Sequence, residues 1–450
     1  MIKRNLLNNL KEWSTKKNRK PLVIRGARQV GKTTLVKEFS KEFDKFIFLN
    51  LEKELDRKIF EESDSVQNVM EILFLTRLGS DITPKDRILI FIDEIQNSPK
   101  AIGFLRYFYE EYHDLYIITA GSRLQELFKT GVSFPVGRVE YLNMRPCFFN
   151  EFLEGKGLAE LSCKVETADI SENLHSHLME LFQTYALTGG MPEILDHYYS
   201  TESISSLSPL YTSLLSGYDE DVEKYAKNMA QVNVLRHILR SGWSHAGQAI
   251  TFNKFGESSF TSSTIHQAFE LLEKAYIVNL DYPVSQSSLP IVQNLKRSPK
   301  LIWLDSGLVN FSAGIQVEYL QNKNLQDIWR GHAVEQIVGQ ELWKVLDRNY
   351  IPKQSYWIRD KKGSTAEIDF ILPYQGMLIP IEVKSGTNSH LRSLQSFMRM
   401  PGAPKVGIRI WSGEFSINDV DILGTDETYR LINLPFYLTG EIDTVLQKFI

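Results

Sequence analysis

The sequence predicts an α/β protein with a parallel sheet near its N-terminal end, helical insertions in the middle and a further α/β region at the C-terminal end. Short apolar runs alternate with helical patterns through the first 150 residues, as in βαβ units whose sheet is covered on both faces. One run, residues 21–25, leads directly into a glycine-rich loop and a helix. That order is typical of a phosphate-binding turn.

Length and composition limit the classes of protein to consider. The chain has 450 residues, of which 43% are hydrophobic and 24% charged, as expected for roughly two to four globular domains. The net charge of −4 excludes a globally basic nucleic-acid binder, so any such role needs local patches. Two cysteines, no signal-peptide pattern and no apolar run of membrane-spanning length predict a cytoplasmic protein without a membrane role.

The glycine-rich loop has the spacing G-x-x-x-x-G-K-[ST] of a P-loop. Backbone N–H groups of such a loop, together with the positive end of the following helix, bind phosphate oxygens. Lys32 is expected to reach the β and γ phosphates of ATP, and Thr33 to hold Mg²⁺. The residues expected to bind nucleotide are Gly26, Ala27, Arg28, Gln29, Val30, Gly31, Lys32, Thr33 and Thr34.

A second apolar run, residues 88–92, ends in Asp93 and Glu94. This is the Walker B pattern, in which Asp93 would hold Mg²⁺ and Glu94 would activate the attacking water. An apolar strand with a solvated acidic end is the ordinary alternative. Its position about sixty residues after a P-loop favours the nucleotide site.

Two further residues are candidates for the chemistry of ATP hydrolysis. Ser122 follows the apolar run 115–120 and could sense the γ-phosphate, although a plain turn serine is an equal alternative. Arg138 could stabilise transition-state charge as an arginine finger, in its own subunit or in a neighbour's, and an ordinary ion pair is the alternative.

Four segments together resemble a large family of bacterial and archaeal AAA+-type P-loop ATPases. They are Gly-Ala-Arg-Gln-Val-Gly-Lys-Thr-Thr at 26–34, Phe-Ile-Asp-Glu-Ile-Gln at 91–96, Ala-Gly-Ser-Arg at 120–123 and Gly-Arg-Val at 137–139. The family's C-terminal region is usually described as a domain of unknown function. The resemblance implies an ATP-hydrolysing AAA+ core, with Arg123 standing where the family's pattern would have a small polar residue.

The middle of the chain reads as a helical lid followed by a region similar to a winged helix-turn-helix. A Ser/Thr-rich cap at 260–264 precedes a helix and then an apolar run at 275–280. The helix carries Glu270 and Glu273 with a single lysine, Lys274, which is poor chemistry for a phosphate surface. A structural or protein-contact role is therefore favoured over DNA reading.

Two alternating segments near the C-terminal end, residues 366–372 and 379–384, predict a hairpin around Gln375 and Gly376. In this register Asp369 lies opposite Glu382 and Glu367 opposite Lys384. Two facing carboxylates repel one another, and a divalent cation would relieve that repulsion. The expected site therefore places Mg²⁺ on Asp369 and Glu382 with Lys384 beside it, for phosphodiester hydrolysis. Glu335, on a predicted helix, could complete the site.

The pattern D-x(12)-E-x-K resembles the PD-(D/E)xK nuclease fold of restriction and repair enzymes, with Ile368 standing where the motif name has proline. Tyr356, Trp357 and the basic residues that follow could form a nucleic-acid rim, or an exposed charged turn. The alternatives for the site itself are a surface hairpin with a Glu–Lys pair and a nuclease fold that has lost its activity.

These expectations combine into four regions: an ATPase core at 1–150, a helical lid at 151–225, a winged-helix-like region at 226–290 and a nuclease-like domain at 291–450. The expected function is ATP hydrolysis coupled to action on DNA or RNA, with Mg²⁺-dependent cleavage by the C-terminal domain. The alternative is a nucleotide-switched interaction protein whose C-terminal domain only binds a protein partner. An oligomer is compatible with both.

Overall fold

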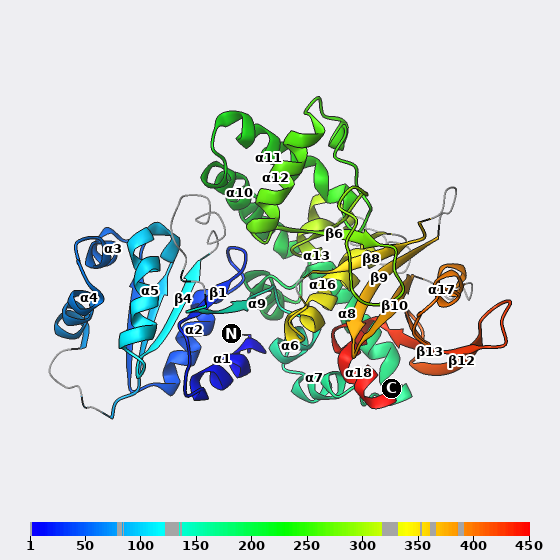
Figure 1. Ribbon diagram of the computed structural model, residues 1–450, viewed down its shortest axis with the longest axis horizontal. Helices are drawn as coiled ribbons and strands as arrows, with labels where there is room; N and C mark the ends of the chain where they lie inside the picture. The colour runs from blue at the N-terminus through cyan, green and yellow to red at the C-terminus, as the bar shows by residue number, and fades with distance from the viewer. Residues whose placement is uncertain are drawn as a thin grey trace. The chain divides into compact units, whose positions relative to one another are not determined.

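The computed structural model describes residues 2–78, 83, 85–121, 135, 137–316, 332–351, 353–360, 366–385 and 391–450. The chain divides into two compact units. One contains residues 3–146 and 274–276, and the other contains residues 1–2, 147–273 and 277–450. We call them the N-terminal unit and the C-terminal unit, and Figure 1 labels their elements.

The N-terminal unit is built on a sheet whose described strands are all parallel, in the order β2-β3-β4-β1-β5. The strands are β1 Leu22–Arg25, β2 Lys45–Asn50, β3 Ile88–Asp93, β4 Tyr116–Gly121 and β5 Glu140–Asn143. The helices are α1 Leu6–Thr15, α2 Lys32–Phe39, α3 Glu54–Glu61, α4 Val66–Leu73 and α5 Pro99–Glu111, with short turns η1 Ser40–Glu42, η2 Phe74–Leu78 and η3 Ile95–Asn97. The predicted parallel core is confirmed.

One face of this sheet packs against α3, α4 and α5. Strand residues such as Ile47, Ile90 and Ile117 form one apolar cluster with Phe60 and Leu105 of the helices, and all five are almost fully buried. Strand β3 is buried at every position, because neighbouring strands and helices cover both of its faces. The apolar runs of the sequence therefore follow from the layering.

Two segments of the C-terminal unit, residues 189–190 and 305–308, are joined by a close backbone contact. Asp305 accepts hydrogen bonds from the N–H of Gly190 at 2.6 Å and of Leu308 at 3.1 Å. Gly189 has φ of +73°, and a Cβ there would lie 2.2 Å from the Asp305 carboxylate. A side chain at position 189 would displace the Asp305 carboxylate, which caps the N-terminus of the helix Ser306–Ser312. Two glycine-containing segments, 189–190 and 305–307, are thus explained by a single contact.

The helices of this unit are drawn from green to red in Figure 1. They are α6 Phe149–Gly155, α7 Ala159–Glu166, α8 His175–Thr188, α9 Pro192–Thr201, α10 Ser208–Tyr225, α11 Met229–Ser241, α12 Ser262–Lys274, α13 Ser306–Ser312, α16 His332–Arg348, α17 Arg392–Met398 and α18 Ile442–Phe449. The short turns are η5 Glu172–Leu174, η6 Ser205–Leu207, η7 Gly242–His245, η8 Phe255–Glu257 and η9 Phe436–Glu441.

The described strands of the C-terminal unit form one mixed sheet in the order β12-β13-β11-β10-β9-β8-β6-β7. They are β6 Val278–Val284, β7 Lys300–Trp303, β8 Ser355–Ile358, β9 Glu367–Tyr374, β10 Met377–Lys384, β11 Val406–Trp411, β12 Ser416–Asp421 and β13 Thr428–Pro435. Strands β6 and β8 pair directly, so the sheet extends across the domain boundary expected at residue 290. Helix α12 is followed by the antiparallel pair of β6 and β7. The division into regions at 226–290 and 291–450 stays a prediction.

The register of the β9–β10 hairpin agrees with the sequence prediction. Met377 pairs with Tyr374 and Ile381 with Phe370, around the turn at Gln375. The next position along each strand is Asp369 on β9 and Glu382 on β10. The hairpin therefore brings the two predicted metal-binding carboxylates to the same place in the sheet.

A buried polar network fixes helix α16 within the unit. Glu341 accepts a hydrogen bond from the hydroxyl of Tyr185 at 2.6 Å and from the N–H of Phe149 at 3.3 Å. One turn later, Lys344 forms an ion pair with Glu441, and both side chains are buried. Burial raises the pKa of Glu341 to about 7, against the opposing effect of the Tyr185 hydrogen bond.

The raised pKa of Glu341 makes stability depend on pH. Between its ordinary pKa of 4.5 and about 7, the folded chain keeps a proton that the unfolded chain has released. The free energy of unfolding therefore falls as pH rises through this window. Glu341→Gln keeps the hydrogen bonds but cannot titrate. It should reduce the decrease in the free energy of unfolding across this pH window by at most about 3 kcal/mol. Urea unfolding, followed by tryptophan fluorescence at pH 5 and pH 7.5, measures the slope.

The exposed Glu160→Gln on α7 is the matched control, and its slope should equal that of the unchanged chain. An equal slope in Glu341→Gln would contradict the assignment of the titration to this carboxyl.

Candidate functional site

The P-loop lies between β1 and α2, and its glycines are required by the backbone. Gly26 has φ of +150°, and a Cβ there would lie 2.2 Å from the carbonyl oxygen of Met144. Gly31 has φ of +97° directly before α2 begins. A residue with a side chain would be strained at Gly31 and would collide at Gly26. The glycine pattern read from the sequence thus corresponds to a real steric limit.

Lys32 points back into its own loop. Its ammonium donates to the carbonyl oxygens of Gly26 at 3.0 Å and of Ala27 at 2.6 Å, and the residue is 7% exposed. Burial lowers the pKa of Lys32 to about 8, although Glu94 and Asp93 partly oppose this. A bound phosphate would offer stronger, charged acceptors to the same ammonium.

Thr33 and Asp93 meet from two different elements. The Thr33 hydroxyl donates to the Asp93 carboxylate at 2.6 Å, although the residues are 60 positions apart in sequence. Burial raises the pKa of Asp93, and the hydrogen bond from Thr33 opposes that shift. A hydroxyl and a buried carboxylate at the mouth of a P-loop are the oxygen donors that Mg²⁺ takes in such sites. The residues therefore fit the expected ion.

Glu94 is oriented by a residue that sequence reasoning did not single out. Glu94 has φ of +53°, directly after β3. The side-chain amide of Gln96 donates to its carboxylate. The Gln96 side chain is buried, so it can hold Glu94 in one orientation. The segment Asp93–Gln96 thus contains both the Glu94 carboxylate and the Gln96 amide that orients it.

Arg4 is a second residue that the sequence did not identify. Its guanidinium donates to the carbonyl oxygen of Val30, within the P-loop, at 2.8 Å. It also donates to the carbonyl oxygen of Arg145 at 2.6 Å. Arg4 is 7% exposed and so acts as a buried brace between the loop and the end of the unit.

The two remaining ATPase candidates have different outcomes. Ser122 lies outside the described residues. Arg138 precedes β5, whose Glu140 lies beside Leu22, whereas the P-loop follows Arg25 at the other end of β1. At about 3.3 Å per strand residue, Arg138 is roughly 15–20 Å along the sheet from its own P-loop. Its guanidinium forms an ion pair with Glu110 at 3.0 Å.

The C-terminal candidate site gathers residues from four elements. Glu335 lies on α16, Asp369 on β9, and Glu382 and Lys384 on β10. The sequence did not predict the residue that joins them. The Lys300 ammonium, at the start of β7, lies 2.6 Å from Glu335, 3.1 Å from Glu367 and 3.1 Å from Asp369. Its side chain is only 2% exposed.

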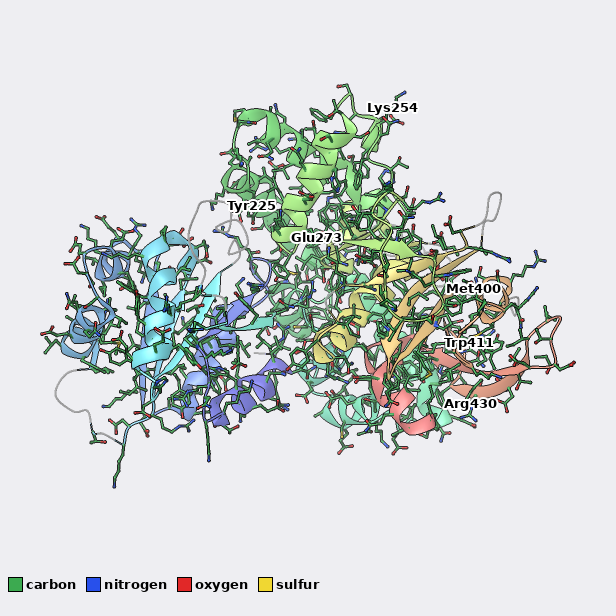
Figure 2. The ribbon with its side chains drawn as sticks, viewed as in Figure 1. Tyr225, Lys254, Glu273, Met400, Trp411 and Arg430 are labelled. Carbon is green, nitrogen blue, oxygen red and sulfur yellow. The ribbon has the colours of Figure 1, made fainter. Side chains whose placement is uncertain are left out.

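The other half of the site is formed within β10. The Lys384 ammonium lies 2.6 Å from Oε1 of Glu382. Oε2 of Glu382 is buried and has no hydrogen-bond partner among the residues that the structure describes. Asp369 accepts the N–H of Val383 at 2.8 Å through Oδ2. Register also places Trp411 of β11, labelled in Figure 2, directly beside Lys384.

The charges of these groups shift one another's pKa values. Burial, and after it the nearby Asp369 carboxylate, raise the pKa of Glu335 and of Glu382 to about 7. Burial lowers the pKa of Lys300, but Asp369, Glu335 and Glu367 outweigh it and hold the pKa above its ordinary value. The ammonium of Lys300 is therefore charged at neutral pH.

A divalent cation fits one part of this cluster. Among the described residues, no three His, Cys, Asp or Glu side chains are grouped so as to hold a metal by themselves. Mg²⁺, however, usually takes one or two carboxylates and completes its shell with water and phosphate. The unpartnered Oε2 of Glu382, beside Asp369, is a buried acceptor of the kind that such an ion would satisfy.

The two aromatic side chains expected to form a nucleic-acid rim before the site are buried, and the lysines at 361 and 362 lie outside the described residues. Trp357 is fully buried and Tyr356 is 3% exposed, so neither ring is available to stack on a base. Both belong to β8, an interior strand whose neighbours cover it. Arg359, which follows, donates to Ser396. The aromatic residues of this pattern belong to a buried strand, and the basic residue that follows them lies just after the end of that strand.

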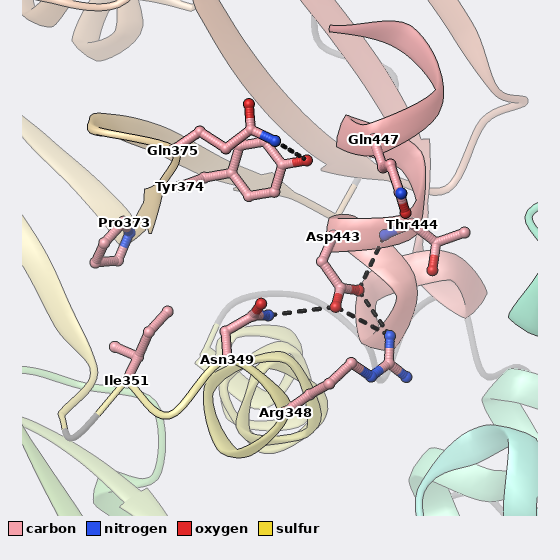
Figure 3. A pocket seen from close by; sticks show the side chains of 9 residues that line it. All are labelled: Arg348, Asn349, Ile351, Pro373, Tyr374, Gln375, Asp443, Thr444 and Gln447. Atoms are coloured by element: carbon pink, nitrogen blue, oxygen red, sulfur yellow. Dashed lines mark hydrogen bonds and ion pairs between the residues drawn. The ribbon is translucent and has the colours of Figure 1, made fainter.

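A cavity of about 490 Å³ lies elsewhere in the C-terminal unit, at the turn of the β9–β10 hairpin (Figure 3). Arg348 and Asp443 form an ion pair at 2.9 Å in its wall, and Tyr374 lines it from the hairpin. Asp369 and Glu382 lie at the opposite end of the hairpin. The candidate site and this cavity are therefore separate features.

Comparison with family models identifies three segments. Residues 18–153 match an AAA domain family, AAA_14. Residues 179–319 and 330–436 match two domains of unknown function, DUF8612 and DUF4143. Together with the P-loop geometry, the first match supports an AAA+-type P-loop ATPase core within residues 18–153. The C-terminal mixed sheet is matched only by domains without an assigned function.

Similar solved structures include a Walker-type ATPase of Pyrococcus abyssi, with 15% identity, a TM-score of 0.42, and coverage of 70% of this chain and 96% of that one. The ORC1 protein of Aeropyrum pernix, solved with DNA, has 14% identity, a TM-score of 0.30 and coverages of 71% and 95%. The RuvB branch migration motor of Thermotoga maritima has 15% identity, a TM-score of 0.27 and coverages of 62% and 89%. Similarity at this level transfers no functional detail.

A search of curated protein sequences found no match to this chain. Within the described parts of the chain, every helix is too short or too polar to span a lipid bilayer.

The brace formed by Arg4 predicts a measurable effect on nucleotide binding. Arg4→Ala removes both hydrogen bonds to the backbone around the P-loop and should weaken ATP binding by about tenfold, equivalent to roughly 1.4 kcal/mol. Titration with a fluorescent ATP analogue measures the affinity. The exposed Lys17→Ala removes a charge of the same sign from the same segment and should bind like the unchanged chain. Equal losses in the two variants would attribute the effect to charge and contradict the brace.

Proposed function

We propose that this protein hydrolyses ATP and acts on nucleic acid, and that its C-terminal site cleaves phosphodiester bonds with the help of a divalent cation. The observation that carries the second part is the convergence of Asp369, Glu382 and Lys384, with a buried carboxylate oxygen left unpartnered. Structural ion pairs normally use every buried oxygen, because an unsatisfied one is costly.

In the ATPase site, each residue has a defined task. Lys32 would exchange the carbonyl oxygens of Gly26 and Ala27 for the β and γ phosphates. Thr33 and Asp93 would hold Mg²⁺, which neutralises phosphate charge when bound. Glu94, held by Gln96, would orient the attacking water and accept its proton.

In the C-terminal site, Asp369 and Glu382 would hold the cation that activates water and neutralises the phosphate. Glu382 raises the pKa of Lys384 against the lowering effect of burial, so its ammonium remains charged. We therefore assign Lys384 to stabilising negative charge on the phosphate. Hydrolysis forms a bond from the water oxygen to phosphorus and breaks the bond to the leaving sugar oxygen, which takes up a proton.

A second function is favoured by two specific observations. Lys300 already neutralises part of the carboxylate cluster without a metal. On the winged-helix-like α12, Glu273 accepts the N–H of Leu280 and lies 3.9 Å from Lys353, so it supports the fold rather than facing a phosphate surface. A nucleotide-switched interaction protein, with a C-terminal unit that binds a protein partner, would use the same ATPase domain.

Cleavage of labelled single- and double-stranded DNA and RNA distinguishes the two functions. With Mg²⁺ or Mn²⁺ present, we expect cleavage by the unchanged chain and at least a hundredfold loss in Lys384→Ala, because the phosphate loses its fixed cation. Lys32→Ala removes ATP hydrolysis, and its effect on cleavage shows whether ATP controls the second site.

The matched control is Lys405→Ala, an exposed lysine whose side chain is 65% accessible, and it should cleave normally. Intact ATP hydrolysis without cleavage of any substrate would contradict the nuclease and support the switch.

The position of Arg138 allows a further test of the ATPase. Since Arg138 is remote from its own P-loop, a finger role requires a neighbouring subunit. Lys32→Ala and Arg138→Ala should each be inactive alone, whereas a 1:1 mixture should recover about a quarter of the unchanged rate, because some interfaces combine an intact P-loop with an intact arginine. Steady-state phosphate release measures the rate. Activity of Arg138→Ala alone would reduce Arg138 to its ion pair with Glu110.

A further inference from the structure

In the proposed nuclease site, the Lys300 ammonium lies among carboxylates, where a metal ion could otherwise bind. Its ammonium contacts carboxylates from two elements, Glu335 on α16 and Asp369 on β9, at 2.6 Å and 3.1 Å. It also lies over the ring of Tyr356, with the nitrogen 5.3 Å from the centroid. The stem is buried, so the charged group cannot swing into solvent.

The two halves of the carboxylate cluster are therefore in different states. On one side, Glu335 and Oδ1 of Asp369 are already paired with a fixed positive charge. On the other side, Oε2 of Glu382 has no hydrogen-bond partner among the described residues, and water cannot easily supply one because the residue is only 5% exposed. A divalent cation is attracted to the second side and repelled from the first by the ammonium.

We propose that Lys300 replaces a second metal ion, so that the C-terminal site binds one divalent cation, which Glu382 and Asp369 would hold. Lys300 is then a positioning residue: it fixes the Asp369 carboxylate and closes the side of the cluster that faces Glu335. The inference rests on the proposed metal-dependent function, and specifies how many ions that function uses.

The test counts Mn²⁺ ions bound to the full-length, nucleotide-free chain by electron paramagnetic resonance. Ions belonging to this site are those lost in Glu382→Gln. We expect one such ion in the unchanged chain, one in Lys300→Arg, which keeps the charge, and two in Lys300→Met, which removes it. The cleavage rate should rise with Mg²⁺ concentration with a Hill coefficient of one in the unchanged chain. Lys405→Met is the control for loss of a lysine charge at the surface.

Two Glu382-dependent ions in the unchanged chain, or a Hill coefficient of two, would overturn the inference and leave the metal-dependent nuclease standing. A count that stays at one in a folded Lys300→Met would overturn it as well. A count of zero in both the unchanged chain and Lys300→Met would overturn the inference together with the proposed metal. If Lys300→Met does not fold, the count and the Hill coefficient of the unchanged chain still decide.

Discussion

The buried ammonium of Lys300 is the constraint on which the arrangement of the C-terminal unit depends. A charge that is 2% exposed is tolerated only where opposite charges surround it closely. The partners come from α16 and from β9, so the first residue of β7 fixes a helix and a central strand together. The Asp369 carboxylate thereby acquires one orientation. Glu382, its neighbour on β10, keeps one oxygen that no group in the described part of the chain satisfies.

Helix α16 carries this constraint into the rest of the unit. Directly after Glu335, the side chain of Gln336 accepts the N–H of Trp303 and donates to the carbonyl of Trp303. One turn later, Gln340 accepts the N–H of Ser306. Glu341 and Lys344 continue the row to Tyr185 and to Glu441. A helix with so many buried polar groups is stable because each of those contacts is satisfied. The site is therefore held by a rigid element rather than by a loop.

Residues on each side of the unit boundary at 146 and 147 form a backbone hydrogen bond within their own unit. Met144 donates to the carbonyl of Arg25, next to the P-loop, at 2.7 Å. Three residues later, Cys147 donates to the carbonyl of Gly190, beside the contact formed by Asp305, at 2.7 Å. The last strand of the N-terminal unit and the first helices of the C-terminal unit are thus each held by contacts within their own unit.

The sequence by itself determined the parallel sheet, the P-loop and the Walker B carboxylates, because their chemistry is written in local spacing and in apolar runs. It also determined the β9–β10 register, since a turn and a period of two fix which residues face each other. It could not reveal Lys300, Arg4 or Gln96, whose roles arise from contacts between distant segments, and it misread Tyr356 and Trp357 because burial depends on neighbouring strands. Only the tertiary structure placed Arg138 at the end of the strands opposite to the P-loop, and a lysine among the carboxylates. The position of a charge relative to other elements is set by packing and not by spacing along the chain.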